Sequence, residues 1–119
     1  MKTLKLVCAF AALTLASGAA FAGGTWTNVV VILISASTSE HIGPDGIVEV
    51  ELSATPVGGA ACGSGYSQWV TIDTSSSGGK IAASILAEAR LTRQPVSVIG
   101  TGTCSAAFPS VEQLSYMVE

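Results

Sequence analysis

Cysteine is the residue of this chain with the widest choice of chemistry, and its spacing is informative. Cys8 falls in an apolar run at the amino terminus, whereas Cys62 and Cys104 lie 42 positions apart in the remainder. Two cysteines in an exported domain are typical of one disulfide. The alternatives are a metal pair, which would need further ligands, and a redox pair, which usually has close spacing. We therefore expect a disulfide between Cys62 and Cys104 and no metal site.

Groups for acid–base or nucleophilic catalysis are scarce. His41 is the only histidine and lies beside a turn, between Glu40 and Asp45, and no serine occurs in a G-x-S-x-G turn. Glu49 and Glu51 lie two residues apart, as paired catalytic carboxylates might, but a solvated strand face has the same pattern. The sequence therefore predicts a protein that is not an enzyme and needs no cofactor.

Aromatic side chains are the better candidates for binding. Aromatic rings beside hydroxyl groups can stack on sugars, although in a small domain about half of the rings belong to the core. Tyr66 and Phe108 fall in predicted loops, and Trp69 and Thr71 share one face of a predicted strand. The candidate ligand-binding residues are therefore Tyr66, Trp69, Thr71 and Phe108.

The amino terminus predicts export. A short cationic start is followed by an apolar run and by the small-x-small sequence Ala20-Phe21-Ala22, the layout of a cleaved signal peptide. We expect residues 1–22 to be removed and residues 23–119 to form one domain, secreted or periplasmic and without a membrane span. Its three basic and eight acidic residues give a net charge of −5, which argues against nucleic acid as a partner.

The elements that would position these residues are five strands and one helix. Strands are predicted over residues 25–35, 47–52, 68–73, 96–104 and 111–119, and a helix over residues 80–94. Five strands with a helix between the third and fourth is the order of the OB-fold, a small Greek-key barrel. An α+β sandwich with the same elements is the competing architecture. The fold class is therefore mainly β, with an OB-like barrel expected.

Two of these elements have a distinctive apolar pattern. The helix should pack through a stripe that includes Ile81, Ile85 and Leu86. The glycines Gly78 and Gly79 should turn the chain into it. Residues 29–34 are apolar without interruption, so strict alternation would leave both faces of the first strand in need of cover. Such a strand favours self-association as a homo-oligomer.

Short motifs along the mature chain resemble a known family. A tryptophan follows the export signal, Cys62 precedes Gly65-Tyr66 and a tryptophan strand, and Gly102-Thr103-Cys104 closes the fourth strand. The chain thus resembles small secreted bacterial OB-fold proteins related to the B subunits of subtilase-cytotoxin-like toxins. That resemblance implies a disulfide-tied OB barrel and, as in the toxin members, a ring pentamer that binds sialylated glycans. The chain departs from those members in its acidic balance, and no binding residue can be carried over.

The function predicted from these observations is a non-enzymatic binding module, with a glycan as the expected ligand and a homo-oligomer as its expected state. The alternative is a structural or inhibitory envelope protein that acts through protein–protein contacts.

Overall fold

The computed structural model describes residues 23–37 and 46–118. The expected signal peptide and His41 lie outside the described residues. The described chain is mainly β, with one α-helix, one short 3-10 helix and the Cys62–Cys104 disulfide. The bounds are β1 Thr25–Val29, β2 Val31–Ala36, β3 Ile47–Leu52, η1 Ala61–Tyr66, β4 Trp69–Asp73, α1 Ser77–Thr92, β5 Val96–Cys104 and β6 Glu112–Val118.

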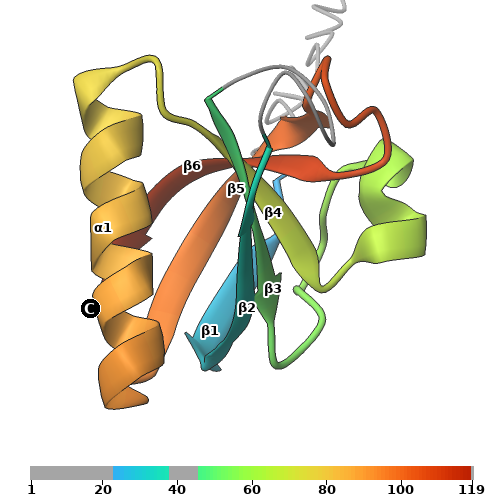
Figure 1. Cartoon of the computed structure of the whole chain (residues 1–119). Helices are drawn as coiled ribbons and strands as arrows, with labels where there is room; N and C mark the ends of the chain where they lie inside the picture. Colours follow the sequence, from blue (N-terminus) through green and yellow to red (C-terminus); the bar gives the residue numbers. More distant parts are fainter. Residues whose placement is uncertain (1–22, 38–45, 119) are drawn as a thin grey trace, which may run out of the picture.

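The strands form one curled sheet, shaped like a half-barrel, in the order β1-β5-β6-β4-β3-β2 (Figure 1). Neighbouring strands are antiparallel except β4 and β6, which are parallel. β1 and β2 lie at the two ends of this order, yet only Val30 separates them along the chain. The predicted count of five strands is therefore wrong, because the segment expected as one first strand forms two.

The division of the expected first strand into β1 and β2 has a local cause. Asn28 has a φ of 54°, and the register between β1 and β5 shifts between Trp26 and Val29. The next residue, Val30, bonds outside both strands: its N–H donates to Ser53 Oγ at 2.9 Å and its carbonyl accepts from the Ser53 N–H at 2.9 Å. The chain therefore leaves β5 and begins a new ladder with β3.

A bulge in β2 decides which of its side chains face outward. β2 has one more residue than β3 between the paired positions Val31–Leu52 and Leu33–Glu51. A bulge of this kind shifts the alternation of side chains by one position. Ile32 and Leu33 are consequently both exposed, whereas Val31 is buried. Strict alternation over residues 29–34 would place Leu33 on the same face as Val31, and the bulge is the reason that it does not.

The core fills the concave side of the sheet, and α1 packs on β2 and β4. Leu86 and Ala89 are buried, with Ala82 packed against them, but Ile81 is 60% exposed. The predicted contact through Leu86 is confirmed and the contact through Ile81 is wrong. The buried side of the helix therefore runs through Leu86 and Ala89 rather than through Ile81. The buried apolar cluster comprises Trp26, Val29, Val31, Val50, Leu52, Val70, Ile72, Leu86, Ala89, Val96 and Val98.

The ends of α1 follow from its sequence. Ser76 is the N-cap, and its Oγ accepts from the Gly79 N–H at 3.0 Å. Gly78 and Gly79 lie within the first turn, so their predicted place before the helix is wrong. A Cβ on Gly79 would overlap the carbonyl oxygen of Asp73, so only glycine allows α1 to start this close to β4. Arg93 caps the other end with a φ of 56°.

Candidate functional site

Three of the four predicted ligand-binding residues meet in one groove. Tyr66 ends η1, Trp69 begins β4, and Phe108 lies in the loop between β5 and β6. With Glu49 of β3 and Pro109, they line an open hollow of about 420 Å³. This volume lies within the range of small-molecule sites. We name this hollow, lined by Glu49, Tyr66, Trp69, Phe108 and Pro109, the aromatic groove.

The segment that carries Tyr66 and Trp69 is tied down at several points. The disulfide links Cys62 in η1 to Cys104 at the end of β5, with the two Cα atoms 6.2 Å apart. The carbonyl of Ser67 accepts from Nε1–H of the buried Trp26 at 3.1 Å. Further along, the Leu52 N–H donates to the Gln68 carbonyl at 2.7 Å. Both aromatic rings therefore project from a backbone with a defined position.

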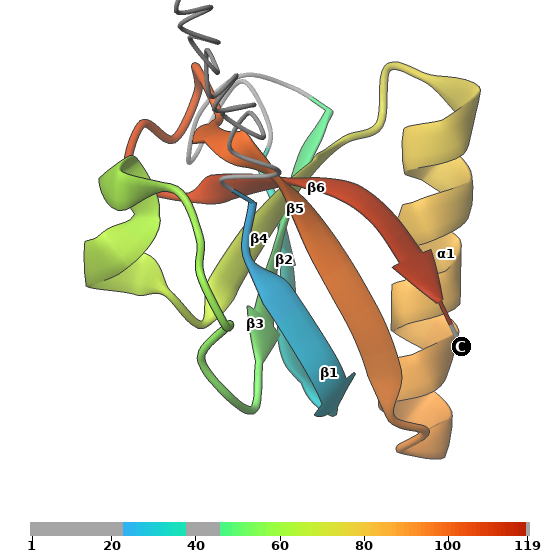
Figure 2. The same cartoon turned by 180° about the vertical axis from the view of Figure 1, so that it is seen from behind.

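The opposite wall of the groove is a short loop closed by its own hydrogen bonds. The Ser105 N–H donates to the Val111 carbonyl at 3.0 Å, and the Val111 N–H donates to the Phe108 carbonyl at 3.0 Å. The Ala107 N–H donates to Ser105 Oγ at 3.2 Å. In both views this loop lies beside η1, on the side of the molecule away from α1 (Figures 1 and 2).

Among the residues that the structure describes, Glu49 is the one charged residue that lines the aromatic groove. Burial raises the pKa of its carboxyl above the ordinary value of 4.5, because removal from water disfavours the charged form. Glu51 pairs across the strands with Trp69, so it lies on the same outer face of the sheet. The described lining of the groove is thus mainly apolar and aromatic, with one carboxylate among it.

Thr71 does not line the aromatic groove. Its position pairs with that of Glu49 across β3 and β4, but the residue is only 1% exposed. Its hydroxyl donates to the Glu112 carbonyl at 3.3 Å. The structure therefore separates Thr71 from the other three candidates and gives its hydroxyl a structural partner.

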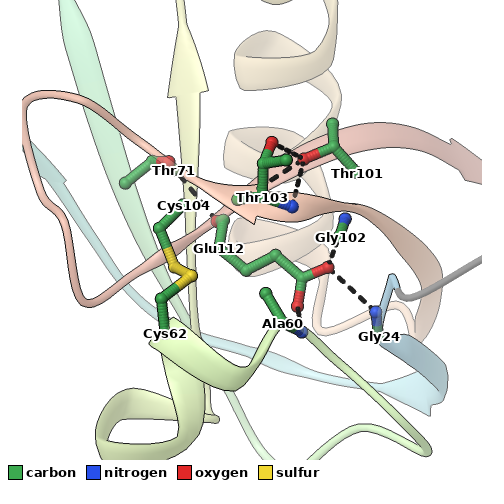
Figure 3. The surroundings of a disulfide bond; sticks show 9 residues. All are labelled: Gly24, Ala60, Cys62, Thr71, Thr101, Gly102, Thr103, Cys104 and Glu112. Carbon is green, nitrogen blue, oxygen red and sulfur yellow. Dashed lines mark hydrogen bonds between the residues drawn. A yellow bond between two sulfur atoms is a disulfide. The ribbon is translucent and has the colours of Figure 1, made fainter.

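The most heavily bonded carboxylate belongs to a residue that sequence reasoning did not single out. Glu112 begins β6 and is 3% exposed. Its Oε1 accepts from the N–H groups of Gly24 and Gly102, and its Oε2 accepts from the Ala60 N–H, each at 2.9 Å. Figure 3 shows this carboxylate beside the Cys62–Cys104 disulfide. We name Glu112 and these three N–H groups the carboxylate cradle.

Glycines make room for the cradle. A Cβ on Gly100 would overlap the Glu112 carboxylate, and a Cβ on Gly59 would lie 3.3 Å from its Oε2. The cradle joins the start of the domain, the loop before η1, the end of β5 and the start of β6. Its contacts span up to 88 positions in the chain, so no local pattern marks Glu112. The clustering of glycines was the one available signal.

Other hollows carry less chemistry. A cleft of about 500 Å³ lies between α1, β4 and β6, and none of the described side chains that line it is aromatic. A smaller hollow of about 320 Å³ shares Tyr66 and Trp69 with the aromatic groove and has Glu112 in its wall.

Within residues 23–37 and 46–118, no group of three or more His, Cys, Asp or Glu residues is arranged to hold a metal ion. Those same residues contain no helix with the length and apolar character to cross a membrane.

The geometry defines a small β domain with a shallow aromatic groove. Comparisons with protein-family models, with curated proteins and with solved structures find no match to this chain.

Proposed function

We propose that this chain is an exported, non-enzymatic binding module that holds a polar ligand such as a glycan in the aromatic groove. The observation that carries the proposal is that Tyr66 and Trp69, which lie three residues apart, share one hollow with Phe108 from the distant loop between β5 and β6. Rings so placed can stack on the apolar face of a sugar, while nearby backbone and hydroxyl groups bind its polar edge.

The topology supports an OB-like barrel. If β1 and β2 count as one interrupted first strand, the strand neighbours are those of a closed five-stranded barrel, with α1 between the third and fourth strands. OB-folds bind ligands on the face of their second and third strands and in the adjoining loops, including the loop between the fourth and fifth. In this numbering those elements are β3, β4 and the loop with Phe108, which are the elements that form the aromatic groove.

Charge favours a glycan over nucleic acid. The expected mature chain carries a net charge of −5, and within residues 23–37 and 46–118 no basic residue lines the groove. Nucleic-acid binding depends on neutralisation of phosphates by lysine and arginine. The resemblance to toxin B subunits agrees with a glycan ligand, and the disulfide and the expected signal peptide agree with a secreted or periplasmic location.

A glycan array, followed by calorimetric titration of each hit, tests this proposal on the mature protein. Trp69→Ala and Tyr66→Ala should each weaken binding by about 1 kcal/mol or more, the typical value of an aromatic contact. Leu91→Ala, at an exposed position of α1, is the matched control and should bind normally. A folded, disulfide-bonded protein that binds no glycan on the array would contradict the proposal.

A second function, association with a copy of itself or with another protein, is favoured by a different surface. Three apolar side chains that lie close together in the sequence are each more than one-third exposed: Val30, Ile32 and Leu33. Apolar side chains grouped in this way often mark an interface. Multi-angle light scattering should show an oligomer at micromolar concentration, and Leu33→Ser should shift it toward monomer. A monomer at all concentrations would refute self-association.

A further inference from the structure

A ligand in the aromatic groove would meet negative charge and no positive charge from the described residues around it. Glu49 lines the groove, Glu51 lies on the same face of the sheet beside Trp69, and no basic side chain of the described part of the chain lines it. The basic residues of the described chain, Lys80, Arg90 and Arg93, all belong to α1 or its cap. Since α1 and η1 lie on opposite sides of the molecule (Figure 2), these cations do not neutralise the groove.

The aromatic walls add to this preference. The face of an aromatic ring carries a negative quadrupole and attracts cations as well as the C–H face of a sugar. Tyr66, Trp69 and Phe108 would therefore favour a cationic group in the same hollow as Glu49. An anionic group at that place would meet a carboxylate and the ring faces without any compensating donor of positive charge.

The environment of Glu49 strengthens the preference of the groove for a cationic group. Its carboxyl is partly removed from water, as the raised pKa indicates. Charges interact more strongly where the surrounding dielectric is low. A cation beside this carboxylate would also replace part of the hydration that the folded protein has removed.

We propose that the aromatic groove selects glycans that bear a free amine, such as glucosamine oligomers, over neutral N-acetylated and acidic sialylated glycans. This inference rests on the proposed glycan-binding function and adds the class of sugar. It differs from what the toxin resemblance implies, because a sialic acid would bring its carboxylate toward Glu49.

Three ligands separate these possibilities in calorimetric titrations of the mature protein: a glucosamine tetramer, an N-acetylglucosamine tetramer and sialyllactose. At about pH 6 the sugar amine is largely protonated. We expect the glucosamine tetramer to bind about tenfold more tightly than its N-acetylated counterpart, which corresponds to about 1.4 kcal/mol. Sialyllactose should bind more weakly than either.

Matched variants assign the preference to Glu49. Glu49→Gln should bring the ratio between the two tetramers close to one and leave binding of the N-acetylated tetramer unchanged. Glu88→Gln makes the same change in net charge on an exposed position of α1, so it should retain the tenfold ratio. If both variants lose the tenfold ratio equally, the preference comes from the overall charge of the protein, and the proposal is overturned.

The remaining outcomes are also decisive. If the N-acetylated tetramer or sialyllactose binds as tightly as the glucosamine tetramer, and Trp69→Ala abolishes that binding, the amine selectivity is wrong while the glycan-binding function stands. If the folded protein binds none of the three ligands and no other glycan, the proposed function fails and the selectivity fails with it.

Discussion

Replacement of Glu112 by alanine is expected to lower the free energy of unfolding by about 3–5 kcal/mol, because it leaves three N–H groups without their acceptor, at a cost of about 1–3 kcal/mol each. The wild-type carboxylate satisfies the N–H groups of Gly24, Ala60 and Gly102. A hydrogen bond to a charged group contributes about 1.5–3 kcal/mol. The three contributions do not add fully, because water can enter the space that the shorter side chain vacates.

The total is large for a domain of this size, since small domains have about 5–15 kcal/mol of net stability. Glu112→Gln keeps one carbonyl oxygen, which can still accept from Gly24 and Gly102. Its amide N–H₂ would face the Ala60 N–H, donor against donor, so this variant should lose less, about 1–3 kcal/mol. The free energy of unfolding should therefore decrease in the order wild type, Glu112→Gln, Glu112→Ala.

Urea denaturation without reductant measures these differences with the disulfide intact. Hydrogen exchange at the amides of Gly24, Ala60 and Gly102 gives an independent readout, and protection there should fall in Glu112→Ala. Glu88→Ala removes an exposed carboxylate from α1 and should change stability by no more than about 0.5 kcal/mol. If Glu112→Ala is as stable as Glu88→Ala and the three amides keep their protection, the carboxylate cradle does not stabilise the fold.

Three further predictions follow from packing and burial. Gly79→Ala should destabilise the domain by about 1–3 kcal/mol, because its Cβ would overlap backbone of β4. Gly78→Ala meets open space in the same helical turn and should stabilise by about 0.5–1 kcal/mol; thermal unfolding that ranks the two the other way would disprove the close approach. Leu86→Ala should cost about 2–5 kcal/mol and Ile81→Ala under about 0.5 kcal/mol, since they are 0% and 60% exposed; equal losses in urea would contradict the assigned helix face. Glu49 has a raised folded pKa, so the folded state binds the extra proton and stability falls as pH rises from the unfolded value of about 4.5 through the folded one. Glu49→Gln should accordingly melt higher than the wild type at neutral pH, with the advantage lost as pH falls to that unfolded value; an advantage that grows in acid would show the opposite sign.

Local patterns in the sequence predicted much of the secondary structure. The alternation of Val48, Val50 and Leu52 with two glutamates predicted β3 with its observed bounds. The helix predicted over residues 80–94 agrees with α1 to within a few residues at each end. The Cys62–Cys104 disulfide followed from a count of cysteines and the expected export. These features depend on residues close in sequence or on chemistry with few alternatives, so they can be inferred without a structure.

The candidate site was predicted in part. Tyr66 and Phe108 were chosen as aromatic residues in predicted loops and Trp69 as an aromatic residue on a strand face, and all three line one hollow. Thr71 was chosen from strand alternation, which gives the face of a residue but not what covers that face. Its burial comes from contacts with β6, which lies about 40 positions away in the chain.

By itself the sequence determined the mainly β character of the chain, its one capped helix, its acidic balance and its cysteine pair, because each depends on composition or on short-range spacing. Only the tertiary structure decided that the first strand divides at Val30, that the bulge in β2 turns Ile32 and Leu33 outward, and that Glu112 holds three distant N–H groups. Register shifts and buried polar contacts depend on which strands become neighbours, and that choice is made by the packing of the whole domain.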